Sequence, residues 1–236
     1  MIHLGAVTLV MALSPSTYRQ ANRVATSRLI YINTWQVLPW FTVLSTLVSL
    51  VLIRIVLVTA LSYGLSQYAL EMMVRVLVLE LIPLSAALFV ALRSGLTFNA
   101  GAVQLSAADV PPSSISHLRR ELVPKVIAGT FAVLSLAMVS SVIVLLLAYL
   151  NVYGLSPWGL AEYTRTVGRV FDPAVTIGFA LKSLLFGLAV ALIPSAVMLE
   201  ARERAQKFSS AVQPGAMRLL SVLVLIEVGS LAVKYI

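Results

Sequence analysis

The sequence predicts an all-α integral membrane protein, in which an N-terminal interfacial elbow helix is followed by five transmembrane helices. Of the 236 residues, 60% are hydrophobic and only 11% are charged. A soluble domain has about 45–50% apolar and about 25% charged residues, because polar side chains must cover much of its surface. The composition therefore argues against a soluble enzyme or a soluble nucleic-acid-binding protein.

Five stretches are apolar and long enough to cross a membrane, which takes about 20 mostly apolar residues per helix. They are residues 35–61, 68–92, 126–150, 174–199 and 219–236. The second stretch is the weakest, because Glu71, Arg75, Glu80 and Pro83 interrupt it. Together the spans take up close to half of the chain, which leaves no room for a large soluble domain. We therefore divide the chain into an N-terminal segment, 1–34, and a five-span domain, 35–236.

The end of the N-terminal segment, from residue 18 to residue 36, has the pattern of an amphipathic helix. Its apolar residues recur at helical spacing: Ala21, Val24, Ala25, Leu29, Ile32 and Trp35. Arginine and polar side chains, among them Arg19 and Arg23, occupy the opposite face. A cationic amphipathic helix that leads into a span is typical of an element lying on the membrane surface. We expect this elbow helix to lie there rather than to extend into the cytoplasm.

Lysine and arginine are distributed unequally between the two sides of the membrane. One side holds Arg19, Arg23, Arg28, Arg93, Arg119, Arg120, Lys125, Arg202, Arg204, Lys207 and Arg218. The other side holds only Arg165, Arg169 and Lys234. Because positive loops stay inside, the N-terminus is predicted to be cytoplasmic and the C-terminus periplasmic. The net charge of +8 is thus explained by membrane orientation, and we expect no nucleic-acid partner.

Two connecting segments are long enough to carry functions of their own. The inner segment, 94–125, contains Gly95, Gly101 and the Pro111–Pro112 pair. It is either a docking surface for another protein or a simple solvated basic connector. The outer segment, 151–173, carries Trp158 and Tyr163, and aromatic residues of this kind favour the membrane interface.

Four ionisable residues lie away from the ends of the spans: Arg54, Glu80, Lys182 and Glu227. Each costs roughly 2.5–3.5 kcal/mol if it is central and unpaired. Two positive and two negative charges sum to zero, which favours mutual pairing or a shared polar cavity. Two interpretations stay open: the charges fix helix packing, or they line a path for a polar or amphiphilic cargo.

Two local features accompany these charges in the second span. Glu71 and Arg75 are four residues apart on one helix, so we expect them to pair with each other. Pro83 lacks the N–H group that would bond to the carbonyl of Leu79, which precedes Glu80. We expect the helix to be disturbed beside this glutamate.

No catalytic or metal-binding pattern is present. The chain has no cysteine, two histidines, and no P-loop, H-E-x-x-H or G-x-S-x-G motif. Its two aspartates, Asp109 and Asp172, are predicted to lie on opposite sides of the membrane. We therefore expect neither an enzyme acting alone nor a metal site.

Several short segments follow one another in an order that points to a known family. The first are L-E-L-I-P at 79–83, A-A-L at 86–88 and R-S-G at 93–95; the others are L-R-R at 118–120, P-K at 124–125, Gly129, L-K-S at 181–183 and Glu227. Over roughly residues 23–233 the chain resembles the MlaE-like (YrbE) permeases, the membrane subunits of ABC transporters that work with mammalian-cell-entry (MCE) lipid-binding proteins. It differs at Leu79, where the family usually has arginine, and at Ile82, where it has glycine. The inner segment also lacks the family's glutamate-rich run.

The resemblance implies a permease subunit of an ABC-type transporter for phospholipid or a similar hydrophobic molecule. Two copies would form the core in the inner membrane, with cytoplasmic ATPase subunits on one side and a periplasmic MCE-domain protein on the other. ATP would be bound by the partner subunits, so that this chain is noncatalytic and needs no cofactor. The sequence does not decide whether the second copy is identical or a close paralogue.

The resemblance also implies roles for individual residues. The family's lipid cavity lies at the dimer interface between spans one, two and five. Glu80 and Glu227 map onto it or near it, Lys182 maps onto a membrane-embedded lysine, and Arg54 is added to this lipid path on physical grounds alone. The residues expected to couple to the ATPase are Asp109, Arg119 and Arg120, and the motif residues expected to be structural are Pro83, Arg93 and Gly95.

Two other functions remain as alternatives. A secondary transporter would be driven by protons passing through Glu80 and Glu227, without an ATPase. A structural membrane anchor would tether other proteins and would tolerate neutral residues at the four buried charges. The sequence leaves open the lipid species and the direction of transport.

Overall fold

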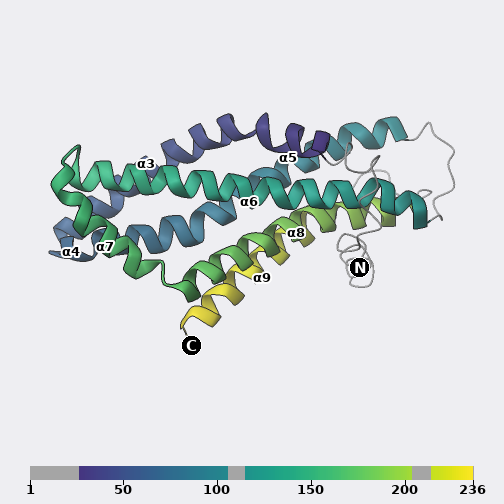
Figure 1. Cartoon of the computed structure of the whole chain (residues 1–236). Coiled ribbons are helices and arrows are strands. Elements are labelled where there is room, and N and C mark those ends of the chain that lie inside the picture. The colour runs from purple at the N-terminus through teal and green to yellow at the C-terminus, as the bar shows by residue number, and fades with distance from the viewer. Residues whose placement is uncertain (1–26, 106–114, 204–213, 236) are drawn as a thin grey trace.

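The computed structural model of the chain describes residues 27–105, 115–203 and 214–235, and these residues form helices without any strand. The elements are η2 (Tyr31–Trp35), α3 (Leu38–Ser62), α4 (Ser66–Met73), η3 (Val74–Leu81), α5 (Ile82–Leu105), α6 (Ile115–Tyr153), η4 (Pro157–Gly159), α7 (Leu160–Val170), α8 (Pro173–Glu203) and α9 (Pro214–Tyr235). Figure 1 shows them as a bundle of long helices, with α7 crossing one end.

Five helical stretches are long and apolar enough to cross a membrane, which confirms the predicted fold class. They are Leu38–Ser62, Tyr68–Arg93, Pro124–Tyr153, Pro173–Ala196 and Ala216–Val233. Each lies within a few residues of the corresponding stretch predicted from the sequence. The agreement follows from the fixed thickness of the bilayer, which sets the length of every span.

The first half of the predicted elbow helix, residues 18–26, lies outside the described part of the chain. Its last residues, from 27 on, are helical and end in the π-helix η2. A turn separates η2 from α3, whose first turn contains Pro39. Proline is favoured at this position because the first helical residues have no intrahelical partner for their N–H groups. The placement of the elbow on the membrane surface stays a prediction.

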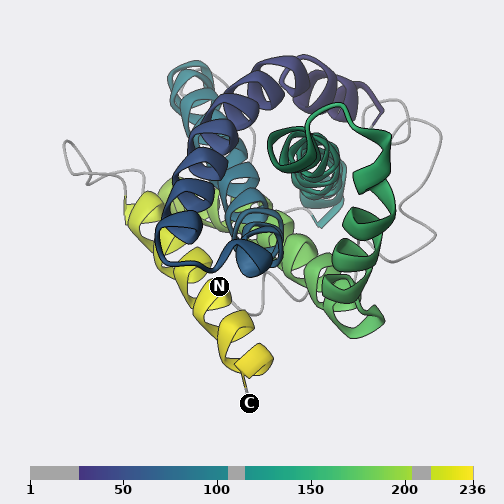
Figure 2. The same ribbon diagram turned by 90° about the vertical axis from the view of Figure 1, so that its left-hand side faces the viewer.

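The span α6 packs against α8, α3 and α5, while α9 packs mainly against α8. Seen from one end in Figure 2, α3 and α9 lie at the edge of the bundle. The buried fraction of each span differs in the same way between the middle and the edge of the bundle. In the second span, 56% of an 18-residue apolar stretch is buried within the chain. The corresponding fractions are only 22% in α3 and 11% in α9. The first and last spans are therefore the two that the rest of the chain covers least.

A close approach of α6 and α8 depends on glycine. A Cβ atom built on Gly187 of α8 would stand 2.8 Å from the Cα atom of Thr130 in α6. No real Cβ atom fits at that distance from another backbone. Gly178, on the same helix, has nothing within 4 Å of the corresponding position.

The outer segment, 151–173, contains two short helices, η4 and α7. Tyr163 of α7 is buried against Tyr149 and Tyr153 of α6, and its hydroxyl donates to the carbonyl of Leu145 at 2.7 Å. Burial raises the pKa of Tyr163 to about 12. Trp158 is 92% exposed, as an aromatic anchor at the membrane interface would be.

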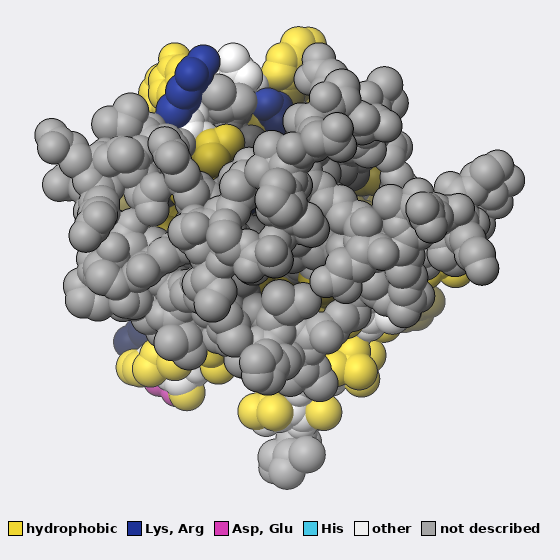
Figure 3. Space-filling view, turned by 90° about the vertical axis from the view of Figure 1, so that its right-hand side faces the viewer, with side chains coloured by type: hydrophobic (Ala, Val, Ile, Leu, Met, Phe, Trp, Pro, Cys, Tyr) yellow, Lys and Arg dark blue, Asp and Glu magenta, His cyan; other side chains and the backbone are white. Residues whose placement is uncertain are grey.

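The inner segment, 94–125, is helical at both ends. Helix α5 continues to Leu105 and α6 begins at Ile115, so only residues 106–114 lie outside the described part. The helix does not end at Gly95 or Gly101, because one glycine costs a helix only about 1 kcal/mol. Figure 3 views the molecule from this end and shows basic side chains near the upper edge of the described surface.

We expect Gly187→Ala to lower the melting temperature of the purified protein. The new methyl group would force α6 and α8 apart, and overpacking of this kind typically costs about 1–3 kcal/mol. The matched control is Gly178→Ala, which should leave stability unchanged or raise it, since alanine stabilises a helix by about 0.5–1 kcal/mol relative to glycine. Thermal unfolding in detergent micelles measures both. Equal shifts for the two variants would contradict the close packing at Gly187.

We expect Tyr163→Phe to destabilise the protein at pH 8 by about 0.5–1.5 kcal/mol, through loss of the hydrogen bond to Leu145. The difference from the unchanged protein should shrink between pH 10 and pH 12. In that range the phenol ionises in the unfolded state but stays neutral in the folded state, so the unchanged protein loses stability as the pH rises. Unfolding free energies at pH 8 and pH 11 test this, with the exposed Tyr68→Phe as control.

Candidate functional site

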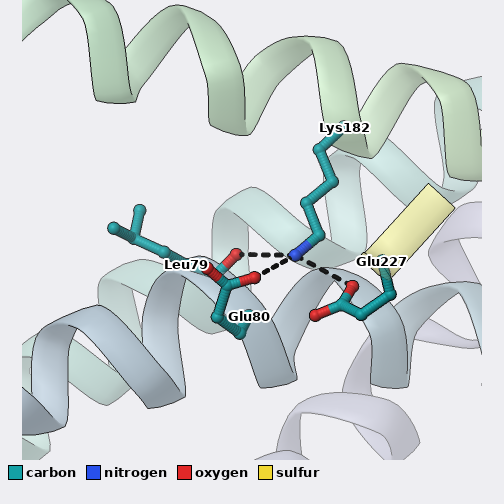
Figure 4. A network of polar contacts seen from close by, with 4 residues as sticks. All are labelled: Leu79, Glu80, Lys182 and Glu227. Atoms are coloured by element: carbon teal, nitrogen blue, oxygen red, sulfur yellow. Dashed lines mark hydrogen bonds and ion pairs between the residues drawn. The ribbon is translucent and has the colours of Figure 1, made fainter. Parts of the chain in front are cut away.

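Three of the four predicted membrane charges meet at one point inside the bundle. The Nζ atom of Lys182, on α8, lies 2.9 Å from Oε2 of Glu227 on α9, and it also pairs closely with Oε2 of Glu80 on η3. Figure 4 shows the lysine side chain reaching between the two carboxylates. These three residues, which we name the ionic cluster, connect the second, fourth and fifth spans.

The lysine is enclosed, but the carboxylates are not. The side chain of Lys182 is 3% exposed, whereas those of Glu80 and Glu227 are each 16% exposed. Part of each glutamate side chain thus reaches the surface of the single chain, although Oε2 of Glu227, which pairs with the buried ammonium group, is itself buried. A buried charge is tolerated only when it is paired in this way.

The backbone of the second span supplies one more contact to the lysine. Residues 74–81 form the π-helix η3, and the N–H group of Ile82 bonds to the carbonyl of Leu77, five residues earlier. Because Pro83 has no N–H group, the carbonyl of Leu79 lacks its usual helical partner. Nζ of Lys182 approaches that carbonyl oxygen at 3.5 Å (Figure 4). The helix disturbance expected beside Glu80 therefore takes the form of a π-helix.

The sequence did not predict the contact of Lys182 with an aromatic ring. Phe186 lies one turn further along α8, fully buried, and its ring centroid is 5.8 Å from Nζ. A ring face in this position stabilises a cation through its quadrupole. The spacing of four residues on one helix was the available signal, since such residues share a face.

Arg54 does not join the ionic cluster. Its neighbour Ile53 is fully buried, so that Arg54, one residue further around α3, is exposed on the outside of the bundle. Within the described part of the chain Arg54 has no ion pair and no hydrogen bond. The four charges predicted to balance one another therefore do not all meet at one place.

Glu71 and Arg75 form the pair expected from their spacing, with Arg75 Nη2 2.8 Å from Glu71 Oε1. Pro83 lies in the first turn of α5, and Arg93 is half-buried at the end of the second span. Gly95, Arg119 and Arg120 lie on α5 or α6 at positions whose side chains are not described, and Asp109 lies outside the described residues. The predicted coupling surface therefore stays a prediction.

The arrangement provides ion pairing rather than covalent chemistry. Among the described residues no group of three histidine, aspartate or glutamate side chains could hold a metal ion. The cluster offers one ammonium group and two carboxylates, which can exchange partners with charged groups of a ligand. The exposed faces of α3 and α9 are mostly apolar. Such a combination suits a molecule with a charged head and apolar chains.

The comparison with protein families gives one result that covers most of the chain. The family described as Permease MlaE matches residues 26–232, a range that includes all three members of the ionic cluster. No curated protein and no solved structure matches the chain significantly. Because the family match extends over far more than half of the sequence, the chain belongs to the MlaE permease family.

Proposed function

We propose that this chain is the permease subunit of an ABC-type phospholipid transporter. Two copies form its membrane core in the cell inner membrane, with each N-terminus in the cytoplasm. Cytoplasmic ATPase subunits bind and hydrolyse ATP, and an MCE-domain protein receives or delivers lipid in the periplasm. Membership of the MlaE permease family and the five apolar spans support the permease assignment.

The observation that carries the proposal is the ionic cluster at the junction of three spans. A lipid has apolar chains, which suit the exposed leucine and valine side chains of α3 and α9, and a charged headgroup, which needs polar partners at membrane depth. Glu80 and Glu227 offer such partners because part of each side chain is exposed. Lys182 holds both of them in place from α8.

Movement of the spans would change this cluster directly. Its members lie on η3, α8 and α9, so any shift of α9 against α8 alters the contact between Glu227 and Lys182. We infer that ATP-driven closure of the partner subunits moves these spans, and that the cavity between two copies opens and narrows as a result. The chain contributes binding and movement, and its partners supply the hydrolysis.

We expect Glu80→Gln and Glu227→Gln to reduce lipid transfer about tenfold, which corresponds to about 1.4 kcal/mol in the barrier. Both changes keep the shape of the side chain and remove the charge that faces Lys182. Transfer of fluorescent phospholipid from proteoliposomes containing the whole complex measures the effect. Transfer at the unchanged rate by both variants would contradict the assignment of the cluster to the lipid path.

Two controls separate transport from folding. Glu71→Gln removes a carboxylate of the same span that pairs within its own helix, and it should leave transfer near the unchanged rate. Size-exclusion chromatography should show the complex intact for all three variants. A complex that falls apart in Glu80→Gln and Glu227→Gln alone would instead assign the cluster to assembly.

The energy source distinguishes the proposed transporter from the two alternatives. We expect ATPase subunits to copurify with the chain, and lipid to stimulate their ATP hydrolysis. Transport driven by a proton gradient without ATP would assign the chain to the secondary transporters. The absence of any transport, together with tolerance of all cluster substitutions, would identify a structural anchor.

A further inference from the structure

The side chains of Glu80 and Glu227 contact each other as well as Lys182. Oε2 of each glutamate pairs with the same atom, Nζ of Lys182, so that the two carboxyl groups lie side by side (Figure 4). The two side chains are also hydrogen-bonded to each other. The second span and α9 are therefore joined directly through two carboxyl groups, in addition to the ion pairs that each makes with α8.

A hydrogen bond between two carboxyl groups requires a proton on one of them. An ionised carboxylate can only accept a hydrogen bond, so two carboxylates have no donor to offer each other. This requirement does not depend on what else Glu80 contacts. Two carboxyl groups that share a site in this way do not both ionise, because their like charges repel each other. One proton is therefore needed between Glu80 and Glu227.

One oxygen of Glu227 shows the same need. Oε2 of Glu227 is buried and forms an ion pair with Nζ of Lys182 at 2.9 Å, but this contact lacks the direction of a hydrogen bond. No other described group donates a hydrogen bond to this oxygen. Buried oxygens without a donor are rare in folded proteins. A proton held between the two carboxyl groups supplies the missing donor.

A shared proton also makes the ionic cluster electrically neutral. Lys182 carries one positive charge, and two glutamates that hold one proton carry one negative charge between them. The side chain of Lys182 is only 3% exposed, so that water screens these charges poorly. Because a net charge at membrane depth is costly, the neutral form of the cluster is the favoured one.

Other charged groups on the helices packed around the cluster lie away from it. Glu71 and Arg75 pair with each other on the second span, toward the end that α7 crosses. Arg93 and Arg218, near the opposite end, are about 20 Å and about 14 Å along their helices from Glu80 and Glu227. The remaining described charges of the bundle lie at the ends of the spans, in α7 or on the exposed face of α3: Lys125, Glu162, Arg165, Arg169, Asp172 and Arg54. Among the described residues, the members of the cluster are thus one another's nearest charged partners.

We propose that the ionic cluster is a proton-binding site, in which Glu80 and Glu227 share one proton at neutral pH and are held together by it. The protonated carboxyl group donates its O–H to the other one, and this bond joins the second span to α9. When the proton leaves for water, the two carboxylates repel each other and only Lys182 still connects them. The cluster is thus a latch between two spans that closes when it binds a proton. This inference concerns the charge state of the chain itself and does not rest on the proposed function.

Infrared spectroscopy detects such a proton directly, because a protonated carboxyl group and a carboxylate absorb at different frequencies. Exposed glutamate and aspartate side chains are ionised at pH 7. The whole complex at pH 7, in a detergent without ester groups, should nevertheless show a protonated carboxyl band that shifts in D2O. Absence of this band from the unchanged complex would overturn the proposal without the use of any variant.

Variants assign the band to the cluster. Glu80→Gln and Glu227→Gln should each remove one protonated carboxyl group per chain, because the single glutamate left beside Lys182 is ionised. The double variant should lose no more of the band than either single variant, since both changes remove the same proton. The matched control is Glu71→Gln, which should leave the band unchanged. No loss in either single variant, or losses that add in the double variant, would overturn the shared proton.

The latch is tested by a distance between the two spans. Leu81→Cys and Val228→Cys are exposed neighbours of the two glutamates, and the chain has no cysteine of its own. With labelled chains diluted by unlabelled ones, the distance between two spin labels should lengthen when the pH is raised past the point at which the infrared band disappears. With Glu227→Gln added, the amide group still donates to Glu80, so the distance should not respond to pH. An unchanged distance across the loss of the band would overturn the latch.

These outcomes separate this inference from the proposed function. A complex that transfers lipid but has no protonated carboxyl group in the cluster contradicts the shared proton and leaves the transporter proposal standing. A complex that shows the shared proton but transfers no lipid contradicts the proposed function and supports this inference.

Discussion

The burial of Lys182 is the constraint on which the arrangement of the other residues depends. An ammonium group that is almost fully enclosed in an apolar bundle is tolerated only with acceptors around it, since removal of one partner from a buried pair typically costs 3–5 kcal/mol. Glu80, Glu227 and the carbonyl of Leu79 are those acceptors, and the ring of Phe186 lies beside them. The second span and α9 therefore both bring acceptors to this one buried charge.

The number and limits of the spans could be read from the sequence because bilayer thickness sets them, whatever the helices touch. The contacts between spans could not. Glu80 and Lys182 are 102 residues apart, and no periodic pattern tells which faces of two uniformly apolar helices meet. For the same reason the four charges expected to balance one another divide into three that meet and Arg54, which does not. The inner segment shows a different limit: its division into the ends of two helices, α5 to Leu105 and α6 from Ile115, was not predicted from the sequence.

Contacts within one helix of the site were easier to predict from the sequence than contacts between helices. Pro83 identifies the carbonyl of Leu79 as one without a helical donor, whatever the rest of the fold does. The spacing of Glu71 and Arg75 likewise identifies a pair within one helix. That the donor to Leu79 is a lysine from α8, which also holds two carboxylates, depends on packing that only the structure shows. The sequence therefore predicted contacts between residues about one helical turn apart, whereas the contacts between helices could be identified only from the structure.

The geometry of the ionic cluster bears on whether its charges only fix helix packing. A buried ion pair is a costly way to join helices, because apolar residues of the same volume are often equally or more stabilising. If packing were its whole purpose, enclosure of all three groups would strengthen the pairing most. Instead Glu80 and Glu227 remain partly exposed, and they do so beside the span with the least internal burial. Partial exposure of the two glutamate side chains weakens the ion pairs that join the spans, but it leaves part of each side chain within reach of a lipid headgroup. The arrangement therefore favours a role in which the cluster exchanges partners over one in which it merely holds the spans together.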